Sequence, residues 1–334
     1  MTWFHPPVSE RVIGRSDIEA ADRRIRPYVR RTPVIEPGPG AFGLACRVTL
    51  KLELMQHTGS FKPRGAFNKI LSSDVPEAGV IAASGGNFGL AVAFAAHTLG
   101  HRAEIFVPSN SPRVKADRVR ALGADVTVVE GWYDEALQAS HGRAADTGAL
   151  PMHAYDQPEV VAGQGTLSLE LVEQVPDADT VLVAIGGGGL IAGVAGWYGG
   201  QTRVVGVEPE TSRSMTAALE AGEPVDVEYG GYAADSLGTR RAGEIAFAIV
   251  SRHVERVVLV SGEAIRDAQR RLWHELRVFA EPGGAAALAA LLAKAYCPRR
   301  TNTWSSSSAG RTASWRCSPR TRRARGRGQR RTRT

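Results

Sequence analysis

One lysine stands in an unusual local setting in the first quarter of the chain. Lys62 follows a Gly59-Ser60-Phe61 turn and precedes Pro63, a residue type that favours the first turn of a helix. The helix dipole opposes a lysine near a helix N-terminus, and burial adds a desolvation cost, so both effects lower the pKa of its amine. Such an amine is a nucleophile near neutral pH. Although most lysines are solvated surface charges, the flanking residues make Lys62 the candidate catalytic residue.

A run of four glycines is the second feature that could do chemistry. It consists of Gly186, Gly187, Gly188 and Gly189. The run follows the apolar segment Val181–Ile185 and precedes a helix expected to begin near Leu190. Glycines there let several backbone N–H groups converge on one anion, helped by the helix dipole. The run matches neither GxGxxG nor GxxxxGK[ST], so we favour a monophosphate site over a dinucleotide or a nucleoside triphosphate. The alternative is a tight strand–helix connection.

The elements that must position these residues alternate between strands and helices, which is typical of a parallel α/β sheet. The expected strands are Val48–Leu52, Val80–Ala83, Ala103–Val107, Asp125–Val129, Thr180–Ile185, Arg203–Val207 and Arg256–Val260. The expected helices are Pro63–Leu71, Gly89–Leu99, Pro112–Leu122, Tyr133–Thr147, Gly163–Gln174, Leu190–Gly199 and Ser261–Trp273. Near-continuous apolar strands predict a sheet that is covered on both faces.

Composition bounds the class of protein. A chain of 334 residues with 43% hydrophobic content suffices for one large core or two modest ones. No apolar run reaches the roughly 18 residues of a membrane helix, and the N-terminus carries no signal-peptide pattern. Cys46, Cys297 and Cys317 are far apart and fit neither a zinc site nor a disulfide framework. We expect a cytoplasmic protein without a membrane segment.

The positive charge is confined to the end of the chain. The formal net charge is +7, but twelve arginines and no Asp, Glu or Lys follow from Pro298 onward, so the first 297 residues carry 7 − 12 = −5. The body is therefore mildly acidic, and only the tail suggests a nucleic-acid partner.

The segment around Lys62 resembles a known motif. Thr58–Ala66, with the sequence ThrGlySerPheLysProArgGlyAla, looks like the cofactor-lysine motif of the serine/threonine dehydratase (threonine ammonia-lyase-like) branch of fold-type II pyridoxal phosphate enzymes. The four-glycine run resembles the phosphate site of this branch. Three further segments are similar, in the family's order: Ser84-Gly85-Gly86-Asn87, Ala162–Thr166 and Glu281–Ala285. The resemblance extends from about Arg11 to Lys294.

The resemblance implies a tryptophan synthase β-like α/β architecture of two three-layer α/β domains with a cofactor cleft between them. The large domain would comprise residues 1–73 and 158–296, and the small domain residues 74–157. No carboxy-terminal regulatory domain is expected after Lys294, and the family suggests a homodimer.

The same resemblance assigns roles to individual residues. Lys62 would bind pyridoxal 5'-phosphate covalently and later take the α-proton of a small amino-acid substrate. Phe61 would pack beside the cofactor ring, and Asn87 would bond its phenolic oxygen. The substrate carboxylate would lie against Ser84, Gly85, Gly86 and Phe88. The phosphate would bind the four glycines and Leu190.

These roles predict a lyase that converts L-threonine, L-serine or a related β-hydroxy amino acid to a 2-oxo acid and ammonia. Serine racemase-like isomerases place a serine at the position of Gly85, and racemisation needs an acid/base group on each face. Gly85 has no proton to give, so elimination is favoured over that alternative. The family's usual histidine after the loop asparagine is Phe88 here, which suggests a less polar site edge and a slightly bulkier or less polar substrate.

A cation site is the least specific expectation. Some relatives bind a divalent or monovalent cation, and Glu208 fits one such position, but Ser214 stands where an aspartate is frequent. Capping of a helix or a surface ion pair is an equal alternative for Glu208. Asp156 and Asp235 also fall in family-like segments, where we expect structural hydrogen bonds.

The tail departs from the resemblance. After Lys294 the family has one more buried strand and a hydroxyl or thiol that bonds the pyridine nitrogen, whereas residues 298–334 are basic and of a composition typical of disorder. A reading frame shifted by two bases over Trp304–Thr312 would permit the missing strand, so a frameshift is one hypothesis and a nucleic-acid arm the weaker other. A catalytically impaired homologue with a damaged C-terminus is therefore the alternative function.

Overall fold

The computed structural model describes residues 13–109, 111 and 113–298. The predicted tail at 298–334, with its proposed frameshift, lies outside the described residues except for Pro298. The body of the chain up to Pro298 forms one compact unit, which contains a short antiparallel ribbon and two parallel sheets. No helix among the described residues is long and apolar enough to cross a membrane.

The first described part of the chain, up to Lys62, consists of one helix, two short strands and three 3₁₀ turns. Helix α1 (Arg15–Ile25) buries Ile18, Ala21 and Ile25 along one face. Strands β1 (Val34–Ile35) and β2 (Leu50–Lys51) pair antiparallel. Three single 3₁₀ turns follow the same part of the chain, at Ala41–Gly43, Glu53–Met55 and His57–Gly59. Helix α2 (Lys62–Leu71) then begins with Lys62 and has Pro63 in its first turn, as the sequence predicts.

The first parallel sheet has the strand order β5-β4-β3-β6. Its strands are β3 (Val80–Ala83), β4 (Ala103–Pro108), β5 (Asp125–Val129) and β6 (Leu150–Met152). The helices between them are α3 (Asn87–Leu99), α4 (Arg113–Arg120) and α5 (Tyr133–Thr147). Side chains of β3 alternate between two clusters: Val80 and Ala82 pack with α3, whereas Ile81 and Ala83 pack with α5. Both faces of this sheet are therefore covered, as predicted.

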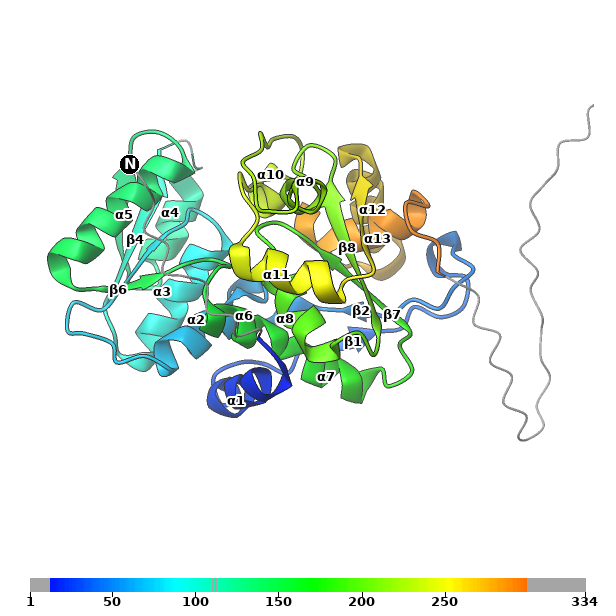
Figure 1. Ribbon diagram of the computed structural model, residues 1–334, viewed down its shortest axis with the longest axis horizontal. Helices are drawn as coiled ribbons and strands as arrows, with labels where there is room; N and C mark the ends of the chain where they lie inside the picture. The colour runs from blue at the N-terminus through cyan, green and yellow to red at the C-terminus, as the bar shows by residue number, and fades with distance from the viewer. Residues whose placement is uncertain (1–12, 110, 112, 299–334) are drawn as a thin grey trace, which may run out of the picture. The chain divides into compact units, whose positions relative to one another are not determined.

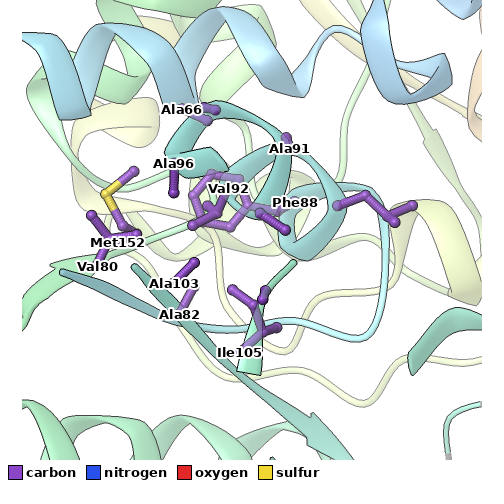
Figure 2. Close-up of a cluster of buried hydrophobic side chains, with 14 of the residues drawn as sticks. Ala66, Val80, Ala82, Phe88, Ala91, Val92, Ala96, Ala103, Ile105 and Met152 are labelled. Carbon is purple, nitrogen blue, oxygen red and sulfur yellow. The ribbon is translucent and has the colours of Figure 1, made fainter. Parts of the chain in front are cut away.

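Small residues dominate the core between this sheet and helices α2 and α3. Figure 2 shows alanines at 66, 82, 91, 96 and 103 around the ring of Phe88, with Ile105 and Met152 at the periphery. Alanine side chains let helices and strands approach closely, and the rings of Phe67 and Phe88 fill part of the remaining volume. Phe88 is consequently buried, at 2% exposure.

The second parallel sheet has the order β7-β8-β9. Its strands are β7 (Thr180–Ala184), β8 (Arg203–Pro209) and β9 (Arg256–Val260). The surrounding helices are α6 (Pro158–Gly165), α7 (Leu167–Gln174), α8 (Gly189–Tyr198), α9 (Ser214–Ala221), α10 (Ala234–Leu237), α11 (Glu244–His253), α12 (Gly262–Leu276) and α13 (Pro282–Leu292). Val183 packs with α8, while Val205 and Val207 pack with α12 and α13 on the other side (Figure 1).

Glycines bring helices α2, α6 and α8 into close contact. A Cβ atom on Gly163 of α6 would lie 2.4 Å from the Arg64 carbonyl oxygen and 2.7 Å from Gly65 Cα of α2. A Cβ on Gly193 of α8 would lie 2.5 Å from the Gly165 nitrogen of α6. Backbone therefore packs directly on backbone in this stack, and the stack fixes α2, whose first residue is Lys62.

Most predicted elements are confirmed, with two kinds of error. The predicted helix Gly163–Gln174 is wrong as one element, because α6 ends at Gly165 and α7 begins at Leu167. Between them the Thr166 hydroxyl donates to the Gly163 carbonyl oxygen at 2.8 Å. Strand β6 escaped prediction because it has three residues and contains Pro151, which a sheet edge tolerates. Helices α1, α9, α10, α11 and α13 were not predicted from the sequence. The domain boundaries at 73/74 and 157/158 remain a prediction.

Candidate active site

The amine of Lys62 lies in an enclosed, largely apolar environment. Lys62 Nζ donates to the Ala154 carbonyl oxygen at 2.8 Å. The centre of the Phe61 ring is 5.2 Å from Nζ, and the centre of the Phe88 ring is 5.5 Å away. Phe61 thus lies beside the reactive amine, close to where a cofactor ring was predicted. The Phe88 ring belongs to the buried core and also borders the amine.

Burial lowers the pKa of Lys62 from 10.5 to about 8. Desolvation of the charged amine is the main cause, and the nearby negative charge of Glu281 opposes it. A substantial fraction of the amine is therefore neutral close to physiological pH. A neutral amine is the nucleophilic form, and it is also the form that accepts a proton.

A buried ion network anchors the first turn of α2. Arg64, which is 1% exposed, donates to both carboxylate oxygens of Glu53, at 2.8 and 2.9 Å, and to Glu170 at 2.7 Å. Lys51 pairs with the same Glu170, and its Nζ also donates to the Thr32 carbonyl oxygen at 2.8 Å. Because Arg64 is two residues after Lys62, the network holds the start of the helix that carries the amine.

The predicted substrate loop follows β3 and leads into α3. In this loop the Gly86 N–H donates to the Ser84 hydroxyl at 3.2 Å. The Asn87 amide donates to both carboxylate oxygens of Glu281, at 2.8 and 3.0 Å. Glu281 opens α13 and belongs to a segment that the resemblance also singled out. The structure thus brings the loop and this late segment together, although they lie almost 200 residues apart.

The four-glycine run is the closest-packed turn of the site. Gly188 has φ +93°, a left-handed conformation that favours glycine, and it caps the N-terminus of α8. A Cβ on Gly187 would lie 2.3–2.5 Å from ring atoms of Tyr155, and one on Gly189 would lie 2.9 Å from Tyr155 Cα. The backbone N–H groups at the start of α8 have no partner within the helix, so they are suited to an anion.

The segment His153–Asp156 connects these parts, and the sequence analysis did not assign it a role at the amine. Ala154 accepts the hydrogen bond of Lys62, and the Tyr155 ring packs on the glycine run. The Tyr155 hydroxyl lies 3.2 Å from the Thr239 hydroxyl and 3.3 Å from the Arg241 carbonyl oxygen. Burial raises the pKa of Tyr155, so the hydroxyl stays protonated.

Asp156 confirms its expected structural role. Its carboxylate accepts from the N–H groups of Glu244 at 3.1 Å and Ile245 at 3.0 Å, which caps the N-terminus of α11. Asp156 was noted in the sequence, but the backbone carbonyl of Ala154 has no side-chain signal that could predict its hydrogen bond with Lys62. Only the fold could reveal that contact.

Glu208 takes the capping role rather than a visible ligand role. The carboxylate is buried, and it accepts from the Met215 N–H at 2.8 Å, the Thr216 N–H at 2.9 Å and the Thr216 hydroxyl at 2.7 Å. Burial raises the pKa of Glu208. The part of the chain that the structure describes has no group of three or more His, Cys, Asp or Glu side chains arranged to hold a metal ion. The cation at Glu208 remains a prediction.

Two ion pairs join the helices of the first sheet to the surroundings of the second. Lys115 of α4 pairs with Asp235 of α10. Arg240 pairs with Asp134 of α5 at 3.1 Å and with Asp226 at 3.1 Å. Asp235 was expected to make structural hydrogen bonds, and its partner is the Lys115 amine. These exposed pairs, with Asn87–Glu281, bridge the two sheet regions.

Comparison with known proteins agrees with this geometry. The protein family described as "Pyridoxal-phosphate dependent enzyme" matches residues 25–302. This chain belongs to that family. The enzyme therefore has the fold-type II α/β architecture that its motifs imply.

Individual relatives show which members of the family the enzyme is similar to. The enzyme is 38% identical to the L-threonine ammonia-lyase of Thermotoga maritima over 288 residues, which are 85% of this chain and 72% of that relative. It is 37% identical to the biosynthetic L-threonine dehydratase of Haemophilus influenzae over 80% of this chain, but it spans only 53% of that protein.

Two solved structures are similar over most of the chain. A threonine deaminase from the organism abbreviated T.th. has TM-score 0.80 at 38% identity, and the match covers 84% of this chain and 92% of that one. Maize serine racemase has TM-score 0.79 at 34% identity, and the match covers 84% of this chain and 87% of that one.

The residues present fit the family's cofactor. A desolvated primary amine lies on α2, and Gly187, Gly188 and Gly189, which have no room for a Cβ atom, lie at the N-terminus of α8. The segment His153–Asp156 contacts both. One covalent attachment point and one anion site are thus held by a common piece of chain, which suits a small aldehyde that carries one phosphate.

Proposed function

We propose that this enzyme is a pyridoxal-phosphate dependent lyase that deaminates L-threonine or L-serine to a 2-oxo acid and ammonia. The observation that carries the proposal is the Lys62 amine, desolvated beside Phe61 and Phe88 and held by Ala154. The names of the relatives support the reaction class. When bound, the cofactor withdraws electrons from the substrate Cα.

The chain's own residues do the remaining work. Lys62 would hold the cofactor through its amine, and the same amine would accept the proton from the substrate Cα, a role that suits a pKa of about 8. The N–H groups of Gly187, Gly188 and Gly189 hold the phosphate. The loop Ser84–Asn87 holds the substrate carboxylate, and Phe61 and Phe88 exclude water from the amine.

In this proposal the Asn87 amide could bond either Glu281 or the ring oxygen of the cofactor. The amide bonds Glu281 in the structure, so binding of the ring oxygen to Asn87 needs that amide to turn or to share its donors. Glu281 then remains close to Lys62, where its charge favours the protonated amine. Glu281 thereby keeps the pKa of Lys62 from falling further.

The test combines a spectrum with product analysis. The purified protein with added pyridoxal phosphate is expected to develop the visible absorbance band of a lysine-bound cofactor, and to release ammonia and a 2-oxo acid from L-threonine or L-serine. Lys62→Ala is the control and should show neither signal. A folded parent protein without the band refutes the proposal.

A serine racemase-like isomerisation is the second candidate, because solved serine racemases share the fold at 31–34% identity. Chiral analysis of L-serine incubated with the enzyme separates the two reactions. Accumulation of D-serine faster than the 2-oxo acid would favour isomerisation.

The remaining parts of the proposal come from the sequence. A homodimer, a cytoplasmic location and a bound cation are expected, and gel filtration and metal analysis of the purified protein test the first and the last. The choice among β-hydroxy amino acids is tested by comparing kcat/KM for serine, threonine and 3-hydroxy analogues with larger apolar groups.

A further inference from the structure

Ser111, which follows β4, packs against Gly85 of the predicted substrate loop. A Cβ atom built on Gly85 would lie 2.5 Å from Ser111 Oγ, 3.1 Å from Ser111 Cβ and 3.2 Å from Val107 Cγ1. The space that a side chain at position 85 would fill is therefore already taken by Ser111. The absence of a side chain at Gly85 leaves the space that the Ser111 side chain fills.

The sheet explains why these distant residues meet. Gly85 follows β3, and Ser111 follows β4, the neighbouring parallel strand, so both lie at the same carboxyl edge. The Ser111 N–H donates to the Pro108 carbonyl oxygen at 3.0 Å, which ties residue 111 to the end of β4. Ligands of parallel sheets collect at such edges.

The Ser111 hydroxyl is available for a ligand. Ser111 is half-buried, and its hydroxyl makes no hydrogen bond to any residue that the structure describes. The Ser84 hydroxyl, within the predicted substrate loop, differs because it already accepts a hydrogen bond from the Gly86 N–H. The loop continues directly into Asn87 and Phe88, and the Phe88 ring is 5.5 Å from Lys62 Nζ. A half-buried hydroxyl with unused donor and acceptor capacity thus lies against the loop that leads to Phe88, whose ring borders the Lys62 amine.

We propose that Ser111 is a substrate-contacting residue whose hydroxyl donates a hydrogen bond to the carboxylate of the amino-acid substrate. It supplies from the neighbouring strand the polar group that Gly85 lacks. This inference rests on the proposed function, because the ligand it names is the substrate of that reaction. It assigns a residue outside the Ser84–Asn87 loop to substrate specificity.

The first test measures binding rather than turnover. L-alanine has the carboxylate and the amine but no β-hydroxyl to eliminate, and its binding to the cofactor-loaded enzyme is followed by the absorbance change of the cofactor. A hydrogen bond to a charged group contributes about 1.5–3 kcal/mol, so Ser111→Ala should weaken L-alanine binding about 10- to 100-fold. Ser251→Ala, an exposed helix serine, is the matched control and should leave binding unchanged.

A hydroxyl swap distinguishes chemistry from space-filling. The double variant Gly85→Ser/Ser111→Gly moves the hydroxyl to the loop itself, and it should recover most of the lost affinity. If Ser111→Ala binds L-alanine as tightly as the parent enzyme, or if the swap binds as weakly as Ser111→Ala, the proposal is overturned.

A second readout needs neither cofactor nor substrate. Gly85→Ala should destabilise the cofactor-free protein through its contacts with Ser111, and Gly85→Ala/Ser111→Gly should relieve part of that loss, which urea unfolding measures. Additive effects of the two substitutions would refute the juxtaposition itself. A parent enzyme that binds cofactor but neither L-alanine nor L-serine would refute the proposed function, and Ser111 with it, whereas failure of Ser111→Ala alone leaves that function intact.

Discussion

Two glycines in helix interiors should respond in opposite ways to the same substitution. Gly163 lies in α6, where a Cβ would meet the Arg64 carbonyl oxygen at 2.4 Å and Gly65 Cα at 2.7 Å, both of them backbone atoms that cannot turn away. Gly142 lies in α5 on the exposed side, where an added Cβ meets nothing within 4 Å. Both substitutions to alanine gain about 0.5–1 kcal/mol of helix propensity.

At Gly163 the backbone contact decides whether alanine raises or lowers the free energy of unfolding. Overpacking typically costs about 1–3 kcal/mol, and here it must push α6 away from α2. We expect Gly163→Ala to lower the free energy of unfolding by about 1–2 kcal/mol, and Gly142→Ala to raise it by about 0.5–1 kcal/mol. The difference between the variants is then about 1.5–3 kcal/mol.

Urea unfolding of the cofactor-free proteins measures this difference directly. The displacement of α2 should also weaken cofactor binding in Gly163→Ala, because Lys62 is the first residue of that helix. Equal unfolding midpoints for the two alanine variants would refute the inference that backbone contact between α2 and α6 positions the amine.

Three further outcomes follow from the site and its surroundings. Lys62→Met should stabilise the cofactor-free protein by up to about 3 kcal/mol at pH 7, since the parent must hold a charged amine whose pKa is lowered from 10.5 to about 8. Between pH 8 and 10.5 the unfolded parent binds more protons than the folded parent, so the free energy of unfolding of the parent rises with pH. The advantage of Lys62→Met over the parent should therefore vanish by about pH 10.5. An advantage that is constant with pH in urea titrations contradicts this. Glu208→Ala should cost about 1–3 kcal/mol in unfolding experiments, because the buried Met215 N–H and the partly buried Thr216 N–H at the start of α9 lose their acceptor, and Glu208→Gln should cost less; equal losses would argue against the capping role. Finally, a double-mutant cycle on Lys115 and Asp235 should give a coupling below about 1 kcal/mol that declines with added salt, as for other exposed pairs; a large, salt-independent coupling would mean that this pair is buried in solution.

The sequence alone determined the chemistry-bearing residues whose signal is local. Lys62 is recognisable from the turn before it and the proline after it, and the four glycines from the apolar strand and helix on either side. The strands Val80–Ala83, Asp125–Val129 and Arg256–Val260 were predicted with the bounds that the structure has, because their apolar and β-branched residues are bounded by clear turn signals.

Only the tertiary structure decided which distant groups meet these residues. The partner of the Lys62 amine is a backbone carbonyl at Ala154, the partner of Asn87 is Glu281, and the neighbour of Gly85 is Ser111. No local pattern encodes such contacts, since they depend on strand order and on how closely the helices approach. The lowered pKa of Lys62 has the same origin: a helix start made it plausible, but the protein packed around the amine removes the water and sets the value.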